Sequence, residues 1–462
     1  MKEGTQPWQM TARELSKAFA QGNLSPLEAF ENTIDRMAAV QPRINALVAL
    51  DLESARAAAL ASTARWQSGT ARSPLDGVAI TVKDNLSVAG MPCRWGSKLY
   101  ADFVPTFDEG PVARMRAAGA VILGKTNVPE FTLEGYTANL VHGATRNPWN
   151  LALTPGGSSG GAVAAVASGV GSLALATDGG GSIRRPAGYT GLAGLKPSRG
   201  AVQREHGMRE ILPGMEVAGP VARSVADMVE VMRIIAGSPG TWKAAPENDY
   251  KRRIVYWRSI ANSPVDSQIL ASVDAAAAAF EKLGHRVEEQ PAPASIALFN
   301  RDVWPVLSTA GLAALMQTMP GQEALLTPTL RTMLAHGRTL SAIDLFEAQR
   351  QVWRLRAELD SLFTQFDCIM TPTAAALAWP ATESHPARIA GQAVDSRGHA
   401  VFTAFANAAG IPALALPAPA SPLGMPIGLQ LLQREGTDAE LLALGLHYEK
   451  HCSPAYRWPV FD

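Results

Sequence analysis

The chain has 462 residues, and its 41 lysines and arginines equal its 41 aspartates and glutamates, so the formal net charge at pH 7 is zero. Hydrophobic residues make up 47% of the chain and charged residues 18%, a composition typical of a large, well-buried globular protein. The missing basic surplus argues against a nucleic-acid partner. No apolar run approaches the roughly 20 residues that span a membrane, so no membrane partner is expected.

The cysteines and the first residues bear on the compartment. Cys93, Cys368 and Cys452 are scattered and show no metal-ligand spacing, which favours free thiols in a reducing cytoplasm. Residues 1–10 lack the basic and apolar regions of a signal peptide. We therefore expect a cytoplasmic protein. Length alone predicts two domains, because 462 residues exceed the usual size of one core.

Three helices are predicted before the first core strand. Thr11 can cap one helix, Ser25 and Pro26 can begin a second, and residues 52–66 form an alanine-rich third. Residues 75–83 (LDGVAITVK) then predict a buried parallel strand, apolar on both faces, with Lys83 at its carboxyl end. A lysine there either reaches water or is deliberately desolvated, and the strand alone leaves both readings open.

Residues 119–126 (GAVILGKT) fit the phosphate-binding loop pattern G-x-x-x-x-G-K-T. In that loop the strand precedes the first glycine, whereas here the residues between the glycines are themselves strand-like. Asn127, Val128 and Pro129 follow, and this is an unfavourable continuation for a helix. A nucleotide site is therefore not expected here.

Two clusters of glycine and serine bracket the stretch around which the chain is organised, residues 154–186. The first (GGSSGG, 156–161) opens a small-residue helix expected to start near Ser159, and residues 172–177 (SLALAT) predict a buried strand. Because such a helix runs antiparallel to the next strand, its start and the strand's end share one sheet edge. Ser158 and Ser182 are therefore expected to face one another.

The second cluster, residues 178–182 (DGGGS), predicts a turn that exposes backbone N–H groups. Such groups can stabilise a developing oxyanion. The expected donors are the N–H groups of Gly179, Gly180, Gly181 and Ser182.

A competing motif lies in the same stretch. Residues 156–160 match G-x-S-x-G, which would make Ser158 the nucleophile of an α/β-hydrolase-type esterase. That motif needs a strand that runs into the serine, and Pro155 disfavours a strand there. It also needs a catalytic histidine downstream, and no downstream histidine lies in a sequence motif that identifies it as catalytic. His447 and His451 have helical metal-ligand spacing but lack a third ligand, so no metal site is expected.

The motifs GGSSGG and TDGGGSIRRPA, with VKDN upstream, resemble those of the amidase signature hydrolases. The resemblance implies an α/β fold, a single large domain with a central mixed, mostly parallel β-sheet flanked by α-helices, and no cofactor. It also implies a Ser–Ser–Lys triad with Ser182 as nucleophile, Ser158 as bridging serine and Lys83 as base. The peptide bond between Gly157 and Ser158 is expected to be cis.

Further residues take roles from this resemblance. Ser159, Asp178 and Arg184 are expected to support the triad, with Arg184 tying down the loop through Asp178. Arg185 departs from the family pattern; it either contacts an acidic or polar substrate group or points to solvent. Three residues are predicted to line the substrate pocket, namely Tyr136, Arg185 and Arg209.

Within the single domain, residues 1–462, four segments are expected. They are a helical lead-in over 1–70, a catalytic core over 71–237, a variable, mainly helical, substrate-determining region over 238–400, and C-terminal core strands and a helix over 401–462. The chain should therefore form one sheet from segments distant in sequence.

The resemblance implies a serine hydrolase that cleaves the C–N bond of a small non-peptide amide, whether a primary amide, an aryl amide or a carbamate, through an acyl-enzyme on Ser182. For Lys83 to be the base, burial must lower its pKa by several units from about 10.4. Family members that transamidate tRNA usually carry a YG…SSLDQ-like stretch. This chain has LPGMEV at the corresponding residues 212–217 instead, so transamidation of tRNA is not expected. A role as one component of a larger complex, such as a glutamine-dependent amidotransferase, stays open, as does the choice between monomer and homodimer.

Overall fold

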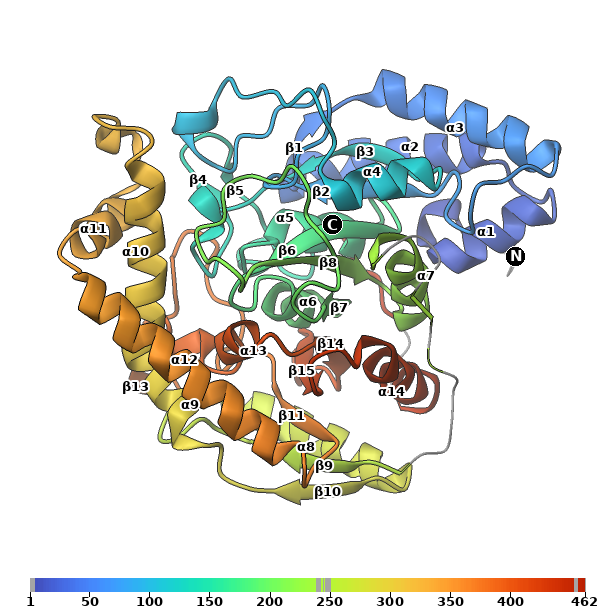
Figure 1. The fold of residues 1–462 in the computed structure, drawn as a ribbon. Coiled ribbons are helices and arrows are strands. Elements are labelled where there is room, and N and C mark those ends of the chain that lie inside the picture. Colours follow the sequence, from blue (N-terminus) through green and yellow to red (C-terminus); the bar gives the residue numbers. More distant parts are fainter. Residues whose placement is uncertain (1–4, 238–241, 244, 246–250, 453–455, 462) are drawn as a thin grey trace.

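The computed structural model describes residues 5–237, 242–243, 245, 251–452 and 456–461, and Figure 1 shows its architecture. Eleven strands of this part form one sheet in the order β1-β3-β2-β6-β8-β7-β14-β15-β11-β9-β10. Their bounds are β1 Leu47–Leu50, β2 Ala79–Lys83, β3 Val121–Thr126, β6 Leu173–Asp178, β7 Ala193–Lys196, β8 Val217–Ala222, β9 Arg253–Tyr256, β10 Arg286–Glu289, β11 Cys368–Pro372, β14 Ala413–Ala418 and β15 Ile427–Leu432. Two small hairpins lie outside the sheet: β4 Ala138–Asn139 with β5 Gly143–Ala144, and β12 Arg388–Ile389 with β13 Gln392–Ala393.

Helices surround this sheet (Figure 1). The α-helices are α1 Ala12–Ala20, α2 Pro26–Ile44, α3 Leu52–Gln67, α4 Gly110–Ala117, α5 Gly160–Ala167, α6 Arg184–Thr190, α7 Val225–Ile235, α8 Ser267–Lys282, α9 Ala294–Leu298, α10 Trp304–Met316, α11 Pro328–Gly337, α12 Ala342–Leu362, α13 Ala404–Ala409 and α14 Asp438–His451. Helix α5 packs on β2, β3, β6 and β8, and α6 packs on β7, β14 and β15. Helix α10 packs on both α11 and α12, at the left of Figure 1.

The sheet is mixed, as predicted from the sequence. Its parallel pairings lie on the two flanks, where β3, β2 and β6 run together and β11, β9 and β10 run together. The pairings from β6 through β8, β7, β14 and β15 to β11 are antiparallel. The expected predominance of parallel pairing therefore holds only on the flanks. Part of the reason is local, because a short loop joins β14 to β15 and favours an antiparallel pair.

Local sequence signals account for the elements that lead to the site. Thr11 and Ser25 cap α1 and α2 as expected, each in a capping box with the glutamate three residues on. Residues 121–126 form strand β3, and the backbone after it continues as a loop rather than a helix, so the phosphate-loop reading is excluded. Strand β2 starts four residues later than predicted but ends on Lys83.

Helix α6, which leads away from Ser182, was not predicted. Helix α6 begins two residues after Ser182, and its sequence RRPAGYT contains proline, glycine and threonine, which are weak helix formers. Tertiary contacts override that preference: the Asp178 carboxylate accepts the backbone N–H of Ile183 at 3.0 Å and so satisfies a free donor at the helix start. The reactive turn is therefore held between strand β6 and helix α6.

The described residues form a single domain around one sheet. The largest apolar cluster runs from α1 through the β2 flank to β14, β15 and α14. None of the helices in the described part of the chain combines the length and the apolar character that a membrane span requires.

Candidate active site

Lys83 occupies the last position of β2 and is completely buried. Its Nζ lies 2.9 Å from Ser158 Oγ, 3.0 Å from the Thr177 carbonyl oxygen and 2.9 Å from Thr177 Oγ1. Thr177 comes from β6, the strand hydrogen-bonded beside β2. Of the two readings of a lysine at a strand end, the structure therefore supports desolvation, because the side chain does not reach water.

Burial lowers the pKa of Lys83 from 10.5 to about 7, against the charges of Glu216 and Asp178, which act to raise it. A substantial fraction of the amine is therefore neutral at neutral pH. Lys83 also differs from its buried neighbour Lys125 on β3, which forms an ion pair with Asp84 at 3.2 Å; that carboxylate raises the pKa of Lys125 despite its burial. Of these two neighbouring lysines, Lys83 is thus the one suited to accept a proton.

Ser158 is fully buried at the sheet edge beside Lys83, and Ser159 is the N-cap of α5. The peptide bond from Gly157 to Ser158 is cis, as expected. Ser159 donates its hydroxyl to the Thr177 carbonyl oxygen at 3.2 Å and its backbone N–H to the Ser182 carbonyl oxygen at 3.2 Å. These contacts join the first serine cluster to the second.

The turn after β6 differs from its prediction at one residue. The backbone N–H of Gly181 donates to Asp178 Oδ1 at 2.7 Å, so Gly181 is wrong as an oxyanion donor because its N–H is already engaged. The N–H groups of Gly179, Gly180 and Ser182 have no hydrogen-bond acceptor among the described residues. Three donors at this turn are thus free for a substrate oxygen.

A buried ion pair holds this turn. Arg184 donates to both oxygens of Asp178 at 3.0 Å, the contact predicted from the sequence, and both side chains are fully buried. Burial acts to raise the pKa of Asp178, but Arg184 and the hydrogen bond from Asn407 outweigh it and hold that pKa well below its usual range. Asn407 and Thr403 bring the C-terminal segment to this pair, since Arg184 also donates to the Asn407 side chain and the Thr403 carbonyl oxygen.

The alternative, in which Ser158 of the G-x-S-x-G motif is the nucleophile of an α/β-hydrolase-type esterase, lacks its structural context. The residues that lead into Ser158, 154–157, do not form a strand, whereas Ser182 follows directly on strand β6 and its turn. His447 and His451 stack edge to face with ring centroids 4.9 Å apart. Within the described residues, no group of three histidine, cysteine, aspartate or glutamate side chains could hold a metal ion.

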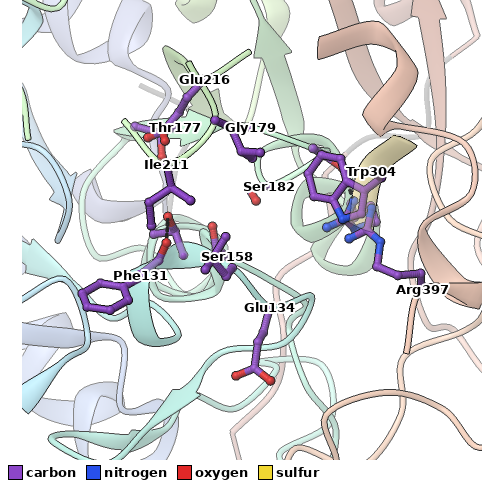
Figure 2. A pocket seen from close by; sticks show the side chains of 15 residues that line it. Phe131, Glu134, Ser158, Thr177, Gly179, Ser182, Ile211, Glu216, Trp304 and Arg397 are labelled. Carbon is purple, nitrogen blue, oxygen red and sulfur yellow. Dashed lines mark hydrogen bonds between the residues drawn. The ribbon is translucent and has the colours of Figure 1, made fainter. Parts of the chain in front are cut away.

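Ser158 and Ser182 share one pocket, and Figure 2 shows both hydroxyls pointing into it. The space between these lining residues, which includes solvent at the open mouth of the pocket, is about 430 Å³. Apolar side chains and a few charged groups complete its wall: Phe131, Thr132, Leu133, Glu134, Arg185, Ile211, Leu212, Glu216, Trp304 and Arg397.

Of the three predicted pocket residues, one lines the pocket and two do not. Arg185 lines the pocket and is buried, so the reading in which it points to solvent is wrong; its guanidinium donates to the Gly180 carbonyl oxygen and to Thr403 Oγ1. Tyr136 packs with Tyr189 and Trp379 instead of lining the pocket. Arg209 is exposed and is likewise absent from the pocket wall.

Several site residues had no sequence prediction. Thr177 could have been found, since it precedes Asp178 in the same motif and faces Lys83 across two paired strands. Asn85, two residues after Lys83, donates to Thr177 Oγ1 at 2.9 Å. Trp304 and Arg397 come from the region expected to decide the substrate, but no local pattern marks them as pocket residues.

A model of the amidase family matches residues 28–442 of the chain. The chain belongs to this family of amidase signature enzymes. The amidase is 34% identical over 477 residues to a glutamyl-tRNA(Gln) amidotransferase subunit of Roseiflexus castenholzii (96% of each chain) and 32% identical over 468 residues to an acylamidase of Rhodococcus erythropolis (97% of this chain and 96% of the relative). It also matches the crystal structure of a bacterial aryl acylamidase of the amidase signature family, with a TM-score of 0.89, 26% identity and coverage of 98% and 99% of the two chains.

Proposed function

We propose that this amidase hydrolyses the C–N bond of a small non-peptide amide, such as a primary amide, an aryl amide or a carbamate, through an acyl-enzyme on Ser182. The observation that carries the proposal is the contact of 2.9 Å between Ser158 Oγ and the buried Nζ of Lys83, in a pocket that also holds Ser182. Lys83, Ser158 and Ser182 then act as base, bridging serine and nucleophile.

The hydrogen bonds around Lys83 suit a neutral amine. The Thr177 carbonyl oxygen can only accept, and Thr177 Oγ1 can donate to Asn85 Oδ1, 3.3 Å away, while accepting from Lys83. A neutral amine has two N–H donors for these two acceptors, which leaves its lone pair for the hydroxyl of Ser158. The proton of Ser158 can then move to Lys83 as Ser158 takes the proton of Ser182.

Ser182 Oγ attacks the substrate carbonyl carbon, and the N–H groups of Gly179, Gly180 and Ser182 stabilise the negative oxygen that forms. The C–N bond breaks as the relay returns a proton to the leaving nitrogen. Water then attacks the ester on Ser182, the same relay takes its proton, and a carboxylic acid leaves. The balance is one amide and one water converted to one acid and one amine.

A second candidate follows from the curated relatives, since one is the amidotransferase subunit named above. An amidase chain that needs a partner protein would fit the same fold. Two observations favour the free-standing enzyme instead: the chain has no net charge and carries LPGMEV at residues 212–217.

The free thiols of the three cysteines fit our proposal of a cytoplasmic enzyme.

The test is turnover by the purified chain alone, measured with acetanilide, a urethane and several primary amides. We expect hydrolysis without a partner, and its loss in Lys83→Ala. Lys83→Arg should be equally inactive because a guanidinium stays protonated. Replacing each of the eight histidines in turn supplies the matched control; a folded histidine variant as inactive as Lys83→Ala would exclude the lysine relay.

A further inference from the structure

The pocket wall carries two arginines that the proposed reaction does not use, Arg185 and Arg397, and the second of them is available to a ligand. Arg397 precedes α13 in the chain and is half-buried, and its guanidinium carbon lies 4.4 Å from the centroid of the Trp304 ring. In Figure 2 these two side chains lie together at the right of the pocket. The guanidinium forms no hydrogen bond or ion pair with any described residue; the hydrogen bonds of Arg397 come from its backbone, whose N–H donates to Asp395 Oδ1 and whose carbonyl oxygen accepts the N–H of Ala400, each at 2.8 Å.

The other charged groups of the pocket wall are either hydrogen-bonded to protein residues or only partly ionised. Glu216 accepts hydrogen bonds from Arg204 at 2.8 Å and from Asn85 at 2.9 Å. Arg185 is held by Gly180 and Thr403, as described above. Burial raises the pKa of Glu134 to about 7, so this carboxyl is partly neutral at neutral pH, and it forms no ion pair with Arg397. Arg397 is thus the charged group that an incoming ligand can satisfy.

An unpaired cation in a partly dry pocket is costly unless an anion meets it. Burial lowers the pKa of Arg397 to about 9, which still leaves the group cationic at neutral pH. Its position is fixed through Trp304. The tryptophan ring supports its flat face, and Trp304 in turn packs so closely on Gly180 that a Cβ added there would meet the ring at 2.4 Å. The guanidinium is therefore held beside the turn that carries Ser182.

We propose that Arg397 binds a carboxylate of the substrate, so that this enzyme prefers amides bearing an acidic group. The inference rests on the proposed amidase function and names its substrate class. A planar guanidinium with free N–H groups matches a carboxylate in two parallel hydrogen bonds. Phe131, Leu133, Ile211 and Leu212 supply the apolar wall around the rest of the molecule.

The test compares acidic and neutral substrates of similar shape. N-phenylsuccinamate and N-phenylbutyramide place the difference on the acyl side, and 4-acetamidobenzoate and 4-acetamidobenzamide place it on the amine side. For at least one pair we expect kcat/KM to favour the acid by about tenfold to hundredfold, the usual worth of a hydrogen-bonded charge. Arg397→Gln should abolish this preference by lowering kcat/KM for the acidic substrate while leaving kcat/KM for the neutral substrate unchanged. Arg397→Lys should keep part of the preference. Arg354→Gln, at an exposed site on α12, is the matched control and should change nothing.

Binding separates this inference from the proposed function. Ser182→Ala should bind the preferred acid about tenfold or more tightly than its neutral partner, and adding Arg397→Gln should remove the difference. That result supports the carboxylate site even if no amide is turned over, an outcome that would overturn the proposed function alone. Equal binding of both partners, an equal loss for both in Arg397→Gln, or preference for a cationic amide that Glu134→Gln abolishes would overturn the carboxylate site.

Discussion

Replacing the proposed base should make the protein more stable at neutral pH. In the unfolded chain Lys83 titrates near 10.5, whereas burial lowers its pKa to about 7 in the folded protein. Between these values the unfolded state binds a proton that the folded state does not, so stability rises with pH across this window. The cost of burying Lys83 is fully present at pH 7 and below, and it disappears as the pH approaches 10.5.

The shift corresponds to about 5 kcal/mol at pH 7, since each pKa unit is worth about 1.4 kcal/mol. Lys83→Met removes that cost and keeps a straight side chain. It also leaves Ser158 Oγ without its hydrogen-bond partner, which costs about 1–3 kcal/mol; Thr177 keeps its contacts with Asn85 and Ser159. The net gain at pH 7 is therefore about 2–4 kcal/mol. For a chain of this length that raises Tm by about 2–4 °C.

Thermal unfolding of wild type and Lys83→Met at pH 7 and pH 9 measures this gain, which should fall to about zero at the higher pH. Lys125→Met is the matched control, because Lys125 is equally buried but paired with Asp84. That variant leaves a buried carboxylate without its partner and should lose about 3–5 kcal/mol at both pH values. A Lys83→Met protein no more stable than wild type at pH 7, or with the same gain at both pH values, would refute the neutral lysine.

Two further predictions concern the rate. Because Lys83 accepts a proton only in its neutral form, kcat/KM for a neutral anilide should rise with pH with a midpoint near 7 and then level off. A profile that falls across pH 6–9 would contradict this prediction. Since histidine titrates near 6.5, the histidine variants described above are measured as well, to show that no histidine causes the rise. In Gly180→Ala the new Cβ would meet Trp304 at 2.4 Å, against 3.2 Å from Leu212 in Gly179→Ala, so kcat should fall about tenfold or more in the first and within about threefold in the second. Equal losses in the two variants would show that Trp304 does not position the turn.

The position of Lys83, Ser158 and Ser182 at one sheet edge could be predicted from sequence because its signals are local, whereas their roles as a triad were implied by the resemblance to the amidase signature hydrolases and stay a prediction. Each of Lys83, Ser158 and Ser182 lies next to an element whose type its own residues determine, and the order of those elements puts them at one sheet edge. The Asp178–Arg184 pair, which spans a single turn, was expected from the same resemblance, and the structure shows it. The central antiparallel pairings were less accessible, since the strand order depends on how distant segments meet.

Other parts of the site required the fold. Helix α6 forms despite weak local propensity because Asp178 accepts N–H groups at its start. That same carboxylate engages Gly181, which no glycine pattern could reveal. Trp304 and Arg397 reach the pocket from segments far downstream, and their sequence neighbourhoods carry no motif. The buried position of Arg185 likewise depends on Thr403, a residue distant in the chain.

The central claim is that Ser182 attacks while Ser158 and Lys83 move its proton. Reaction of the purified enzyme with a fluorophosphonate, followed by peptide mapping, tests it most directly because the reagent stays on the attacking oxygen. We predict a single adduct on Ser182, formed far more slowly in Lys83→Ala and absent in Ser182→Ala. An adduct on Ser158 instead would contradict this claim and support the α/β-hydrolase-type esterase.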